Sequence, residues 1–322
     1  MKVAILDDYQ SVAKDMADWK SLSGTDVEFY SDHISEDQEL VRRLKPFEII
    51  MGMRERTPFP KSLIDQLPNL KLLITSGARN ASFDLEAATN HGILVCGTQG
   101  SGEGPTELTW GLILALLRNI PQEDRLTREG KWGTSVGIGL KGKTIGLLGL
   151  GHIGSLVAKV ADAFGMNVVA WSQNLTPERA AECNAKLVSK TELFELSDIL
   201  SIHVRLSDRT KGLVGEAELN LMKATSYLIN ISRGPIVDED ALISHLKSQK
   251  LAGAGLDTFD VEPLSPSHPL MSLSNVVLTP HIGYVTQEGY TAFYQGVVEN
   301  IKAFMSGEPI RVINQEVLNK KN

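Results

Sequence analysis

The segment TIGLLGLGHIGSLVAKVADAFG, residues 144–165, constrains the fold of this chain more than any other. A β-rich run leads into Gly149-x-Gly151-x-x-Gly154, an amphipathic run follows, and a second apolar run starts at Asn167. In a β–α–β unit the first glycine makes a tight turn, the second lets backbone approach a pyrophosphate, and the third lets the helix pack on the strand. The helix N-terminus then offers N–H groups and a positive dipole end to the phosphates. The segment therefore predicts a dinucleotide-binding domain, whereas a lone glycine motif would be weak evidence.

Short apolar runs alternate with polar, helix-like runs along most of the chain. We expect buried strands at residues 2–6, 27–30, 48–53, 71–75, 93–97, 144–149, 167–171, 198–204, 226–232, 252–259 and 275–280. The helical run after the second strand opens with a capping box, in which Ser35 caps and Gln38 reaches back, and the next helical run opens with Pro60. This alternation predicts an α/β protein with two Rossmann-like domains, each built on a parallel sheet that is covered on both faces.

The Gly-rich segment GTQGSGEGPTE, residues 97–107, is the best candidate for a hinge between the domains. A long apolar helix is expected after it, at residues 106–120. The last helical run, residues 286–307, has an apolar face that needs a partner, and the simplest is a return to the first domain. We therefore expect a discontinuous, flavodoxin-like substrate domain at 1–100 and 287–322, a dinucleotide-binding domain at 101–286, and an active site in the cleft between them.

Composition excludes several classes of protein. The 322 residues carry a net charge of −7 without a basic stripe, which argues against a nucleic-acid or anionic-membrane partner. The longest apolar run, around Trp110–Leu117, is about a third to a half of the roughly 20 residues that span a bilayer. The N-terminus reads as a strand and lacks a signal peptide's apolar core. Cys96 and Cys183 lack metal-type spacing, so we expect two reduced thiols, no metal site and a cytoplasmic protein.

The residue that meets the adenosine ribose leaves the choice between NAD and NADP open. About 20 residues past the glycines an acid normally binds the ribose hydroxyls and repels a 2′-phosphate. The matching position here is Ser172, which can accept or donate a hydrogen bond but carries no charge. The nearest cation is Arg179. A helix-capping role for Ser172, without cofactor contact, is the alternative.

Three strand ends carry residues suited to acid–base chemistry. Arg233 follows the run YLINIS, Asp257 and Glu262 lie in LDTFDVEPL, and His281 follows VVLTP. Each taken singly has an ordinary interpretation, such as a surface ion pair or a hydrogen-bonded loop histidine. Because ligands bind at the carboxyl ends of parallel strands, the four together behind a dinucleotide loop predict an active site.

These residues and motifs resemble the D-isomer-specific 2-hydroxyacid dehydrogenase family, which includes D-lactate, hydroxypyruvate and 3-phosphoglycerate dehydrogenases. The resemblance covers nearly the whole chain and includes SIHVRLSDRTKGLVG, LINISRGPIVDEDAL, AGAGLDTFDVEPL and TPHIGY. It places the family's catalytic Arg, Glu and His on Arg233, Glu262 and His281, and its nicotinamide-contacting Asp on Asp257. It further implies cofactor contacts from the residues His152, Ile153, His203, Thr210 and Ile231.

The chemistry of a 2-oxo acid reductase fits these residue types. The Arg233 guanidinium can hold the substrate carboxylate and polarise the carbonyl. Hydride arrives from the nicotinamide, and His281 donates the proton to the oxygen, or accepts it in reverse. Glu262 accepts from the other ring nitrogen, which fixes the tautomer and favours the protonated imidazole.

The substrate side is expected to come from the first domain. LLITSGARNASFDLEAA resembles the family loop whose backbone N–H groups, here around Ser76, Gly77 and Ala78, hold the carboxylate. Arg54 can add a cation, although a structural salt bridge is the alternative for it and for Arg79. Arg205 stands where relatives often have Pro, and neither it nor Arg79 receives a role.

Two interpretations of the function remain, one as an enzyme and one as a binding protein. The first is an enzyme, an NAD(P)-dependent D-2-hydroxyacid dehydrogenase acting on a small 2-hydroxy or 2-oxo acid. The second is a dinucleotide-gated binding module, since corepressors share this fold and keep the catalytic trio. The stretch LTREGKWGTSVGIGLKG, residues 126–142, resembles the arm through which family members dimerise, so the resemblance implies a homodimer.

Overall fold

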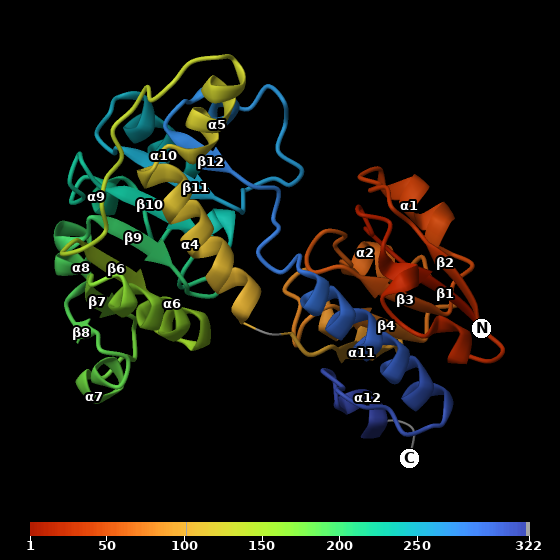
Figure 1. Ribbon diagram of the computed structural model, residues 1–322. Coiled ribbons are helices and arrows are strands. Elements are labelled where there is room, and N and C mark those ends of the chain that lie inside the picture. The colour runs from red at the N-terminus through yellow and green to blue at the C-terminus, as the bar shows by residue number, and fades with distance from the viewer. Residues whose placement is uncertain (101, 320–322) are drawn as a thin grey trace. The chain divides into compact units, whose positions relative to one another are not determined.

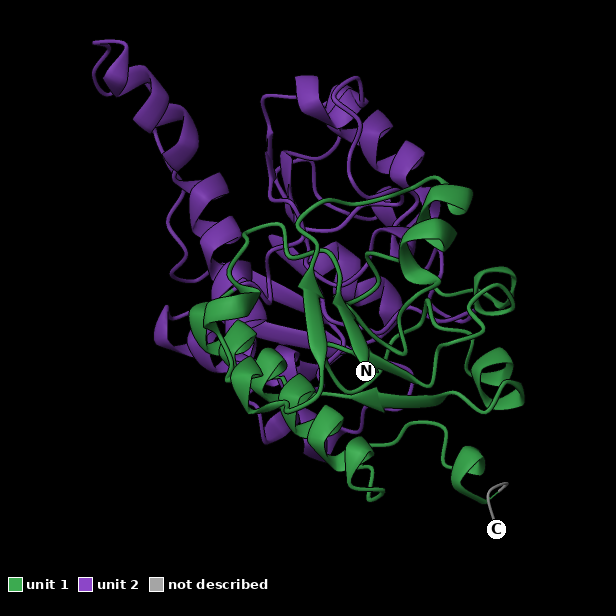
Figure 2. Ribbon diagram, turned by 90° about the vertical axis from the view of Figure 1, so that its right-hand side faces the viewer, with its two compact units in different colours: residues 1–101, 286–322 green, residues 102–285 purple. Residues whose placement is uncertain are grey.

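The computed structural model describes residues 1–100 and 102–319, and the chain divides into two compact units (Figures 1 and 2). Unit 1 comprises residues 1–101 and 286–322, and unit 2 comprises residues 102–285. Each unit is built on one sheet whose paired strands all run parallel. Both therefore have a carboxyl edge at which loops from several strands meet.

Unit 1 has a five-stranded sheet in the order β2-β1-β3-β4-β5. Its strands are β1 (Lys2–Ile5), β2 (Asp26–Phe29), β3 (Ile49–Gly52), β4 (Leu72–Thr75) and β5 (Leu94–Gly97). Its helices are α1 (Asp37–Leu44), α2 (Lys61–Ile64), α3 (Leu85–Asn90), α11 (Gln287–Met305) and α12 (Glu316–Asn319), with 3₁₀ turns η1 (Ala13–Asp15) and η2 (Trp19–Ser21). Every residue of β3, β4 and β5 is buried, as expected for parallel strands covered on both faces.

The last long helix belongs to unit 1 although its sequence follows unit 2. Thr286 caps α11, and the helix buries Phe293, Tyr294 and Val297. The buried Asn300 side chain donates to the Gly97 carbonyl at the end of β5 (2.8 Å). The apolar face of residues 286–307 is therefore covered by the sheet of the first unit.

Unit 2 has a seven-stranded sheet in the order β12-β11-β10-β9-β6-β7-β8. Its strands are β6 (Thr144–Leu148), β7 (Asn167–Trp171), β8 (Lys186–Leu187), β9 (Ile199–Ile202), β10 (Tyr227–Asn230), β11 (Gly253–Leu256) and β12 (Val276–Leu278). Its helices are α4 (Glu103–Leu117), α5 (Ile120–Arg128), α6 (His152–Ala163), α7 (Pro177–Ala181), α8 (Lys190–Leu196), α9 (Glu216–Leu219) and α10 (Glu239–Lys247), with 3₁₀ turns η3 (Gly234–Ile236) and η4 (Pro269–Ser272).

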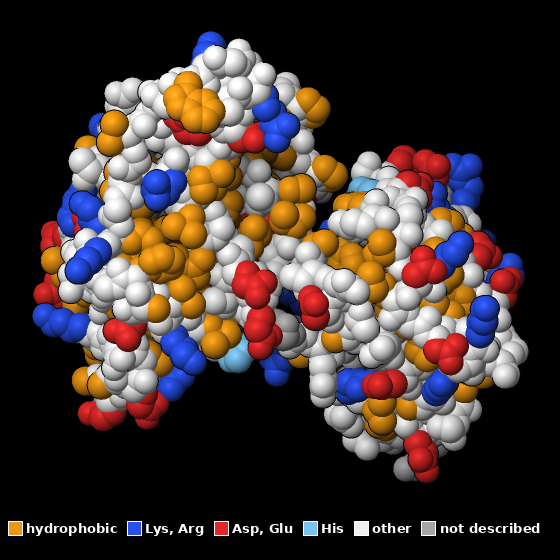
Figure 3. All heavy atoms as spheres, in the orientation of Figure 1, with side chains coloured by type: hydrophobic (Ala, Val, Ile, Leu, Met, Phe, Trp, Pro, Cys, Tyr) orange, Lys and Arg blue, Asp and Glu red, His pale blue; other side chains and the backbone are white. Residues whose placement is uncertain are grey.

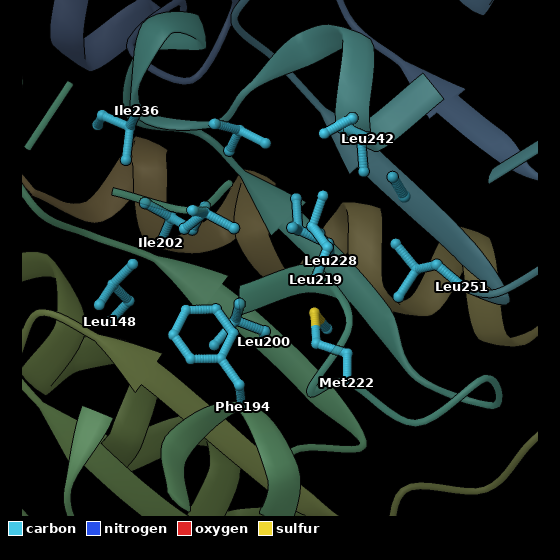
Figure 4. Close-up of a cluster of buried hydrophobic side chains, with 14 of the residues drawn as sticks. Leu148, Phe194, Leu200, Ile202, Leu219, Met222, Leu228, Ile236, Leu242 and Leu251 are labelled. Carbon is cyan, nitrogen blue, oxygen red and sulfur yellow. The ribbon is translucent and has the colours of Figure 1, made fainter. Parts of the chain in front are cut away.

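Two hydrophobic clusters cover the opposite faces of this sheet. On one face, Leu148 and Leu200 pack with Phe194 of α8 and Leu242 of α10 (Figure 4). On the other, neighbouring strand residues pack against α4 and α6, with Ile113 and Val157 in the cluster. Successive strand side chains point to opposite faces, so β6, β7, β9, β10 and β12 each contribute apolar side chains to both clusters.

The expected strands are all present, but several ends and one cap differ from the sequence prediction. The predicted strands 198–204, 226–232 and 252–259 end two or three residues earlier, where the chain leaves the sheet to form site loops. The Ser35 capping box is wrong. Glu36 is the N-cap of α1, and its carboxylate accepts from the backbone N–H groups of Gln38 and Glu39.

The long apolar helix after residue 100 also differs from its predicted range. It begins at Glu103 rather than at 106 and ends at Leu117 rather than at 120. Asn119 then adopts a left-handed conformation (φ 51°), and α5 starts in a new direction at Ile120. Asn tolerates that conformation better than most residues, which explains the break.

Candidate active site

The glycine loop of unit 2 has the geometry that a pyrophosphate requires. Gly149 has a φ of 103°, and its N–H donates to the Trp171 carbonyl (2.8 Å). A Cβ at Gly154 would lie 2.3 Å from the Gly149 carbonyl oxygen, so only glycine lets α6 approach the loop this closely. A Cβ at Gly151 would have no neighbour within 4 Å, so the backbone there faces open space. The loop therefore fits a dinucleotide.

The first turn of α6 completes this cradle. Ser155 makes the first helical hydrogen bond, to Gly151, so the N–H groups of His152, Ile153 and Gly154 precede the hydrogen-bonded part of the helix. These groups and the helix dipole are what a phosphate binds. The His152 side chain instead lies against Gly102, where a Cβ would be 2.5 Å from its ring.

Ser172 occupies the expected position beside the loop. It follows β7, whose last residue Trp171 pairs with Leu148 just before Gly149. Its carbonyl accepts from Leu175, which closes a turn, and its side chain is half-buried and caps no helix, because Thr176 caps α7. The helix-cap alternative for Ser172 is therefore wrong.

The other predicted cofactor residues have distinct surroundings. His203 follows β9, contacts Ser201 Oγ through Nε2 (2.9 Å), and burial lowers its pKa to about 4. Thr210 Oγ1 donates to the Arg205 carbonyl (2.6 Å) and so closes the following loop. Ile231 is buried in the cluster that covers one face of the sheet. His203 is therefore neutral near pH 7, and Thr210 shapes the loop.

Arg233 is held at the end of β10 by its neighbours. The buried Asn230 side chain accepts from Ser232 N–H (3.0 Å) and donates to the Arg233 carbonyl (2.9 Å), which fixes the turn. Arg233 Nη1 donates to the Ser232 carbonyl (2.6 Å). A Cβ at Gly234 would lie 2.1 Å from the Phe259 carbonyl carbon. This close packing brings the Arg233 turn against the segment that carries Glu262.

Asp257 anchors the loop that carries His281. The carboxylate is fully buried and accepts from Thr279 Oγ1 (2.6 Å), Ile282 N–H (2.8 Å) and Gly283 N–H (2.8 Å). Burial raises the pKa of Asp257 above its ordinary value, although the three donors oppose this. The three donors bracket His281 in sequence, so Asp257 fixes the backbone from which the imidazole projects.

Glu262 and His281 form a close pair. Glu262 Oε2 accepts from His281 Nδ1 (2.6 Å), and Glu262 Oε1 accepts from Phe259 N–H (3.0 Å). Their side chains are 30% and 11% exposed, so the pair lies mostly out of water. With Nδ1 committed to the carboxylate, Nε2 is the ring nitrogen that can exchange a proton with a substrate.

In unit 1, the Arg54 guanidinium lies against the loop after β4. It has a left-handed backbone (φ 52°), its N–H donates to Ser76 Oγ (2.8 Å), and its Nη1 donates to the Ser76 carbonyl (3.1 Å). A Cβ at Gly77 would lie 2.1 Å from Arg54 Nη1. Glycine at this position is therefore what lets the guanidinium lie over the loop.

The prediction that N–H groups around Ser76–Ala78 bind a carboxylate needs a correction. Ser76 N–H donates to the Gly52 carbonyl (3.2 Å), and Gly77 N–H donates to Thr98 Oγ1 (2.8 Å). Both donors are therefore already engaged within the fold. Within the described ranges, Ala78 N–H donates to no acceptor, so it is the donor of the three that a ligand can use.

Sequence reasoning missed the residues that position these groups. Asn80 is buried, and its amide donates to the Arg54 carbonyl and to Thr75 Oγ1 (3.0 Å). Asn230 and Thr279 act similarly on the Arg233 and His281 loops. The available signal was a short polar residue within four positions of each predicted site residue. Arg79 and Arg205 are exposed, and nothing in the structure gives them a role.

Comparisons with known proteins agree on one family. The family model of the NAD-binding domain of D-isomer specific 2-hydroxyacid dehydrogenases matches residues 110–283. A glyoxylate reductase of Aeropyrum pernix is 40% identical over 267 residues, which is 80% of each chain. A D-3-phosphoglycerate dehydrogenase of Archaeoglobus fulgidus is 37% identical over 97% of this chain, which spans 58% of that protein. A solved phosphoglycerate oxidoreductase of Vibrio cholerae matches with a TM-score of 0.91 and 37% identity, over 95% of this chain and 99% of that one.

The described residues contain neither a membrane-spanning helix nor a metal-binding cluster. No helix in residues 1–100 and 102–319 is long and apolar enough to cross a membrane. The same ranges hold no cluster of three or more His, Cys, Asp or Glu side chains that suits a metal ion. Cys96 and Cys183 are free thiols, and burial raises the pKa of Cys96 to about 12.

Proposed function

The chain belongs to the D-isomer-specific 2-hydroxyacid dehydrogenase family and is an NAD(P)-dependent oxidoreductase acting on a CH–OH group, and we propose that Arg233, Glu262 and His281 carry its reaction. The observation that carries this proposal is the 2.6 Å contact between Glu262 Oε2 and His281 Nδ1 at the carboxyl edge of the sheet. A bound reduced nicotinamide supplies the hydride for C2 of a 2-oxo acid. The chain must then supply one proton and stabilise the developing oxyanion.

Each residue has one task in this proposal. His281 Nε2 donates the proton to the substrate oxygen, and in the oxidative direction it accepts that proton. Glu262 orients the imidazole and stabilises its charged form from the Nδ1 side (2.6 Å). Arg233 holds the carboxylate and polarises the carbonyl through its fork of donors. Asp257 keeps the His281 loop in place through its three hydrogen bonds.

We further propose that the loop after β4 in unit 1 contributes to substrate binding. Ala78 N–H has no partner in the described ranges, and Arg54 Nη1 is fixed over Gly77. A backbone donor and a guanidinium together suit one carboxylate. The substrate class that fits is a small 2-oxo acid, and glyoxylate is the first choice because the relative at 40% identity is a glyoxylate reductase.

The experiment is a turnover panel with glyoxylate, hydroxypyruvate and pyruvate, each with NADH and NADPH. We expect turnover with at least one pair, and we expect His281→Ala to abolish it while the dissociation constant of the cofactor changes little. Near-normal turnover by His281→Ala would refute the assignment of the acid. Cofactor binding without any turnover by the wild type would favour a dinucleotide-gated binding module, an alternative that the named relatives do not support.

We propose that the chain forms a homodimer. Trp132 and Val136 are 88% and 94% exposed in the irregular segment after α5, which is unusual for side chains of their size and apolarity. Figure 3 shows further hydrophobic side chains gathered on the surface over α4. Sedimentation equilibrium tests the proposal: we expect twice the monomer mass for the wild type and a shift towards monomer for Trp132→Asp combined with Val136→Asp. A monomeric wild type would refute it.

A further inference from the structure

A cation lies beside the glycine loop, on the side where β7 ends. Arg179 belongs to the short helix α7, and its Nη2 donates to Ser155 Oγ (3.2 Å). Ser155 lies in the first turns of α6 and donates in turn to the carbonyl of Gly151 (2.8 Å). Two hydrogen bonds therefore connect the guanidinium to the second glycine of the loop, and the contact crosses from one β–α connection to the next.

The neighbouring groups leave this cation accessible. Arg179 Nη1 also contacts Glu182 Oε2 (2.7 Å), in a pair whose side chains are 50% and 64% exposed. Cys183 donates its thiol hydrogen to the same Ser155 Oγ (3.3 Å), so the hydroxyl has two donors and one acceptor around it. An exposed ion pair of this kind contributes little to stability. Its arginine can therefore exchange the carboxylate for an anion of higher charge.

Residue 172 is a serine and therefore lacks the carboxylate that would repel such an anion. At this position an Asp or Glu binds the ribose hydroxyls of NAD and excludes a 2′-phosphate. Ser172 is half-buried, uncharged, and one residue past the strand that adjoins the glycine loop. The segment after β7 therefore lacks the usual acid, and the helix α7 that follows it supplies a guanidinium in contact with the first turns of α6.

We propose that Arg179 binds the 2′-phosphate of NADP(H), with Ser155 placing the guanidinium and Ser172 leaving room for the anion, so that this chain prefers NADPH to NADH. The inference rests on the cofactor site proposed at Gly149–Gly154. Arginine suits the task because its planar fork of donors matches phosphate oxygens. The bond to Ser155 orders the Arg179 side chain before the cofactor arrives, which reduces the entropy lost on binding.

Glu182 opposes the phosphate in this arrangement. Its carboxylate repels a dianion and competes with it for Arg179 Nη1 (2.7 Å). When the phosphate binds, the Glu182 side chain must release the guanidinium and move into water, which its 64% exposure permits. Glu182→Gln removes both the repulsion and the competition, so the proposal predicts tighter NADPH binding in that variant.

The test measures binding to the purified full chain, without turnover. Isothermal titration with adenosine 2′,5′-bisphosphate and with 5′-AMP isolates the 2′-phosphate, and nicotinamide fluorescence gives dissociation constants for NADPH and NADH. The variants are Arg179→Ala, Arg179→Lys, Glu182→Gln and Ser172→Asp. Lys61→Ala is the control, because it removes one positive charge from an exposed helical ion pair in unit 1.

We expect the wild type to bind NADPH and the bisphosphate more tightly than NADH and 5′-AMP. Arg179→Ala should weaken NADPH binding by roughly tenfold to a hundredfold and NADH binding less than about twofold, the range for losing one charge-assisted contact. Arg179→Lys should keep part of the affinity, Ser172→Asp should weaken NADPH binding more than NADH binding, and Lys61→Ala should change neither.

Two outcomes overturn the proposal and can be told apart. If Arg179→Ala leaves the ratio of NADPH to NADH affinity within about twofold of the wild type, or if the wild type binds NADH and rejects NADPH, Arg179 is not a 2′-phosphate ligand. If neither dinucleotide binds, the glycine-loop site itself is wrong, and this inference fails with it.

Discussion

Replacing Glu262 by Gln removes one charge from the His281 pair while it keeps the length of the side chain. Glu262 accepts two hydrogen bonds, from His281 Nδ1 (2.6 Å) and from Phe259 N–H (3.0 Å). An amide has one accepting oxygen, so in either orientation its NH₂ group faces one of these two donors. The variant must therefore lose the contact to the imidazole, or keep it without charge and lose the contact that fixes the segment at Phe259.

The expected loss of kcat/KM follows from the charge and the burial of the hydrogen bond between Glu262 and His281. A hydrogen bond to a charged partner contributes about 1.5–3 kcal/mol, and the pair is only 30% and 11% exposed, so water replaces it poorly. The imidazolium forms in the oxidative direction and is consumed in the reductive one, so this energy enters the barrier. At 1.36 kcal/mol per factor of ten, kcat/KM should fall by about tenfold to 150-fold.

The assay is steady-state reduction of glyoxylate, with thermal unfolding and the dissociation constant of the cofactor measured on the same samples. Glu239→Gln is the matched control, because Glu239 contacts His268 at 3.0 Å with exposures of 21% and 20% in the same unit. We expect Glu239→Gln to leave kcat/KM within about twofold of the wild type. If Glu262→Gln also stays within that range, Glu262 does not assist His281 and the acid–base assignment loses its support.

Three further predictions concern the residues around the site. Asp257→Asn should lower the free energy of unfolding by about 2–3 kcal/mol in urea, because its amide faces one of three donors such as Gly283 N–H. Asn80→Ala should raise KM for glyoxylate several-fold at nearly constant kcat, because the Arg54 carbonyl loses its buried partner. Burial lowers the pKa of His203 from 6.5 to about 4, so between these values the unfolded chain binds a proton that the folded chain does not. The free energy of unfolding should therefore decrease as the pH is lowered through that window in the wild type, and decrease less in His203→Gln.

The strands and the glycine loop were predictable because their signals are local. Residues 144–149 and 226–232 are predicted as buried strands because apolar side chains fall on both faces of each segment, and parallel sheets covered on both faces require such runs. The N-terminus of α1 was not predictable in the same way. Ser35 and Glu36 are neighbours that can both accept from the first turn, and the choice of Glu36 depends on the path of the loop between β2 and α1.

The sequence identified the residues that are proposed to react, but it did not identify the residues that hold them in place. Arg233, Glu262 and His281 follow strands, and a parallel sheet brings strand ends to one edge. The engagement of Gly77 N–H by Thr98 Oγ1 joins two loops 21 residues apart, and such side-chain contacts have no sequence signature. The same holds for Arg179 and Ser155, which are 24 residues apart, so the sequence left the cofactor choice open.

Backbone conformation adds one argument that the sequence lacked. Arg54 and His281 both have a φ of 52°, which costs a non-glycine residue about 1 kcal/mol or more. Strain alone does not mark a site, since Ser11, Gln249 and Arg311 are also left-handed here and have no proposed role. Asparagine, as at Asn119 and Asn184, tolerates that conformation well. Arginine lacks that tolerance, so the surrounding structure must hold Arg54 in this conformation.

The structure holds both residues in the same way. Asp257 binds the backbone on either side of His281, while Ser76 and Asn80 bind the N–H and the carbonyl of Arg54. In each case buried polar side chains hold the left-handed backbone through hydrogen bonds. The left-handed conformation sets the direction in which the Arg54 side chain leaves the backbone, and this supports the proposal that Arg54 contacts the substrate with an argument that is independent of its charge.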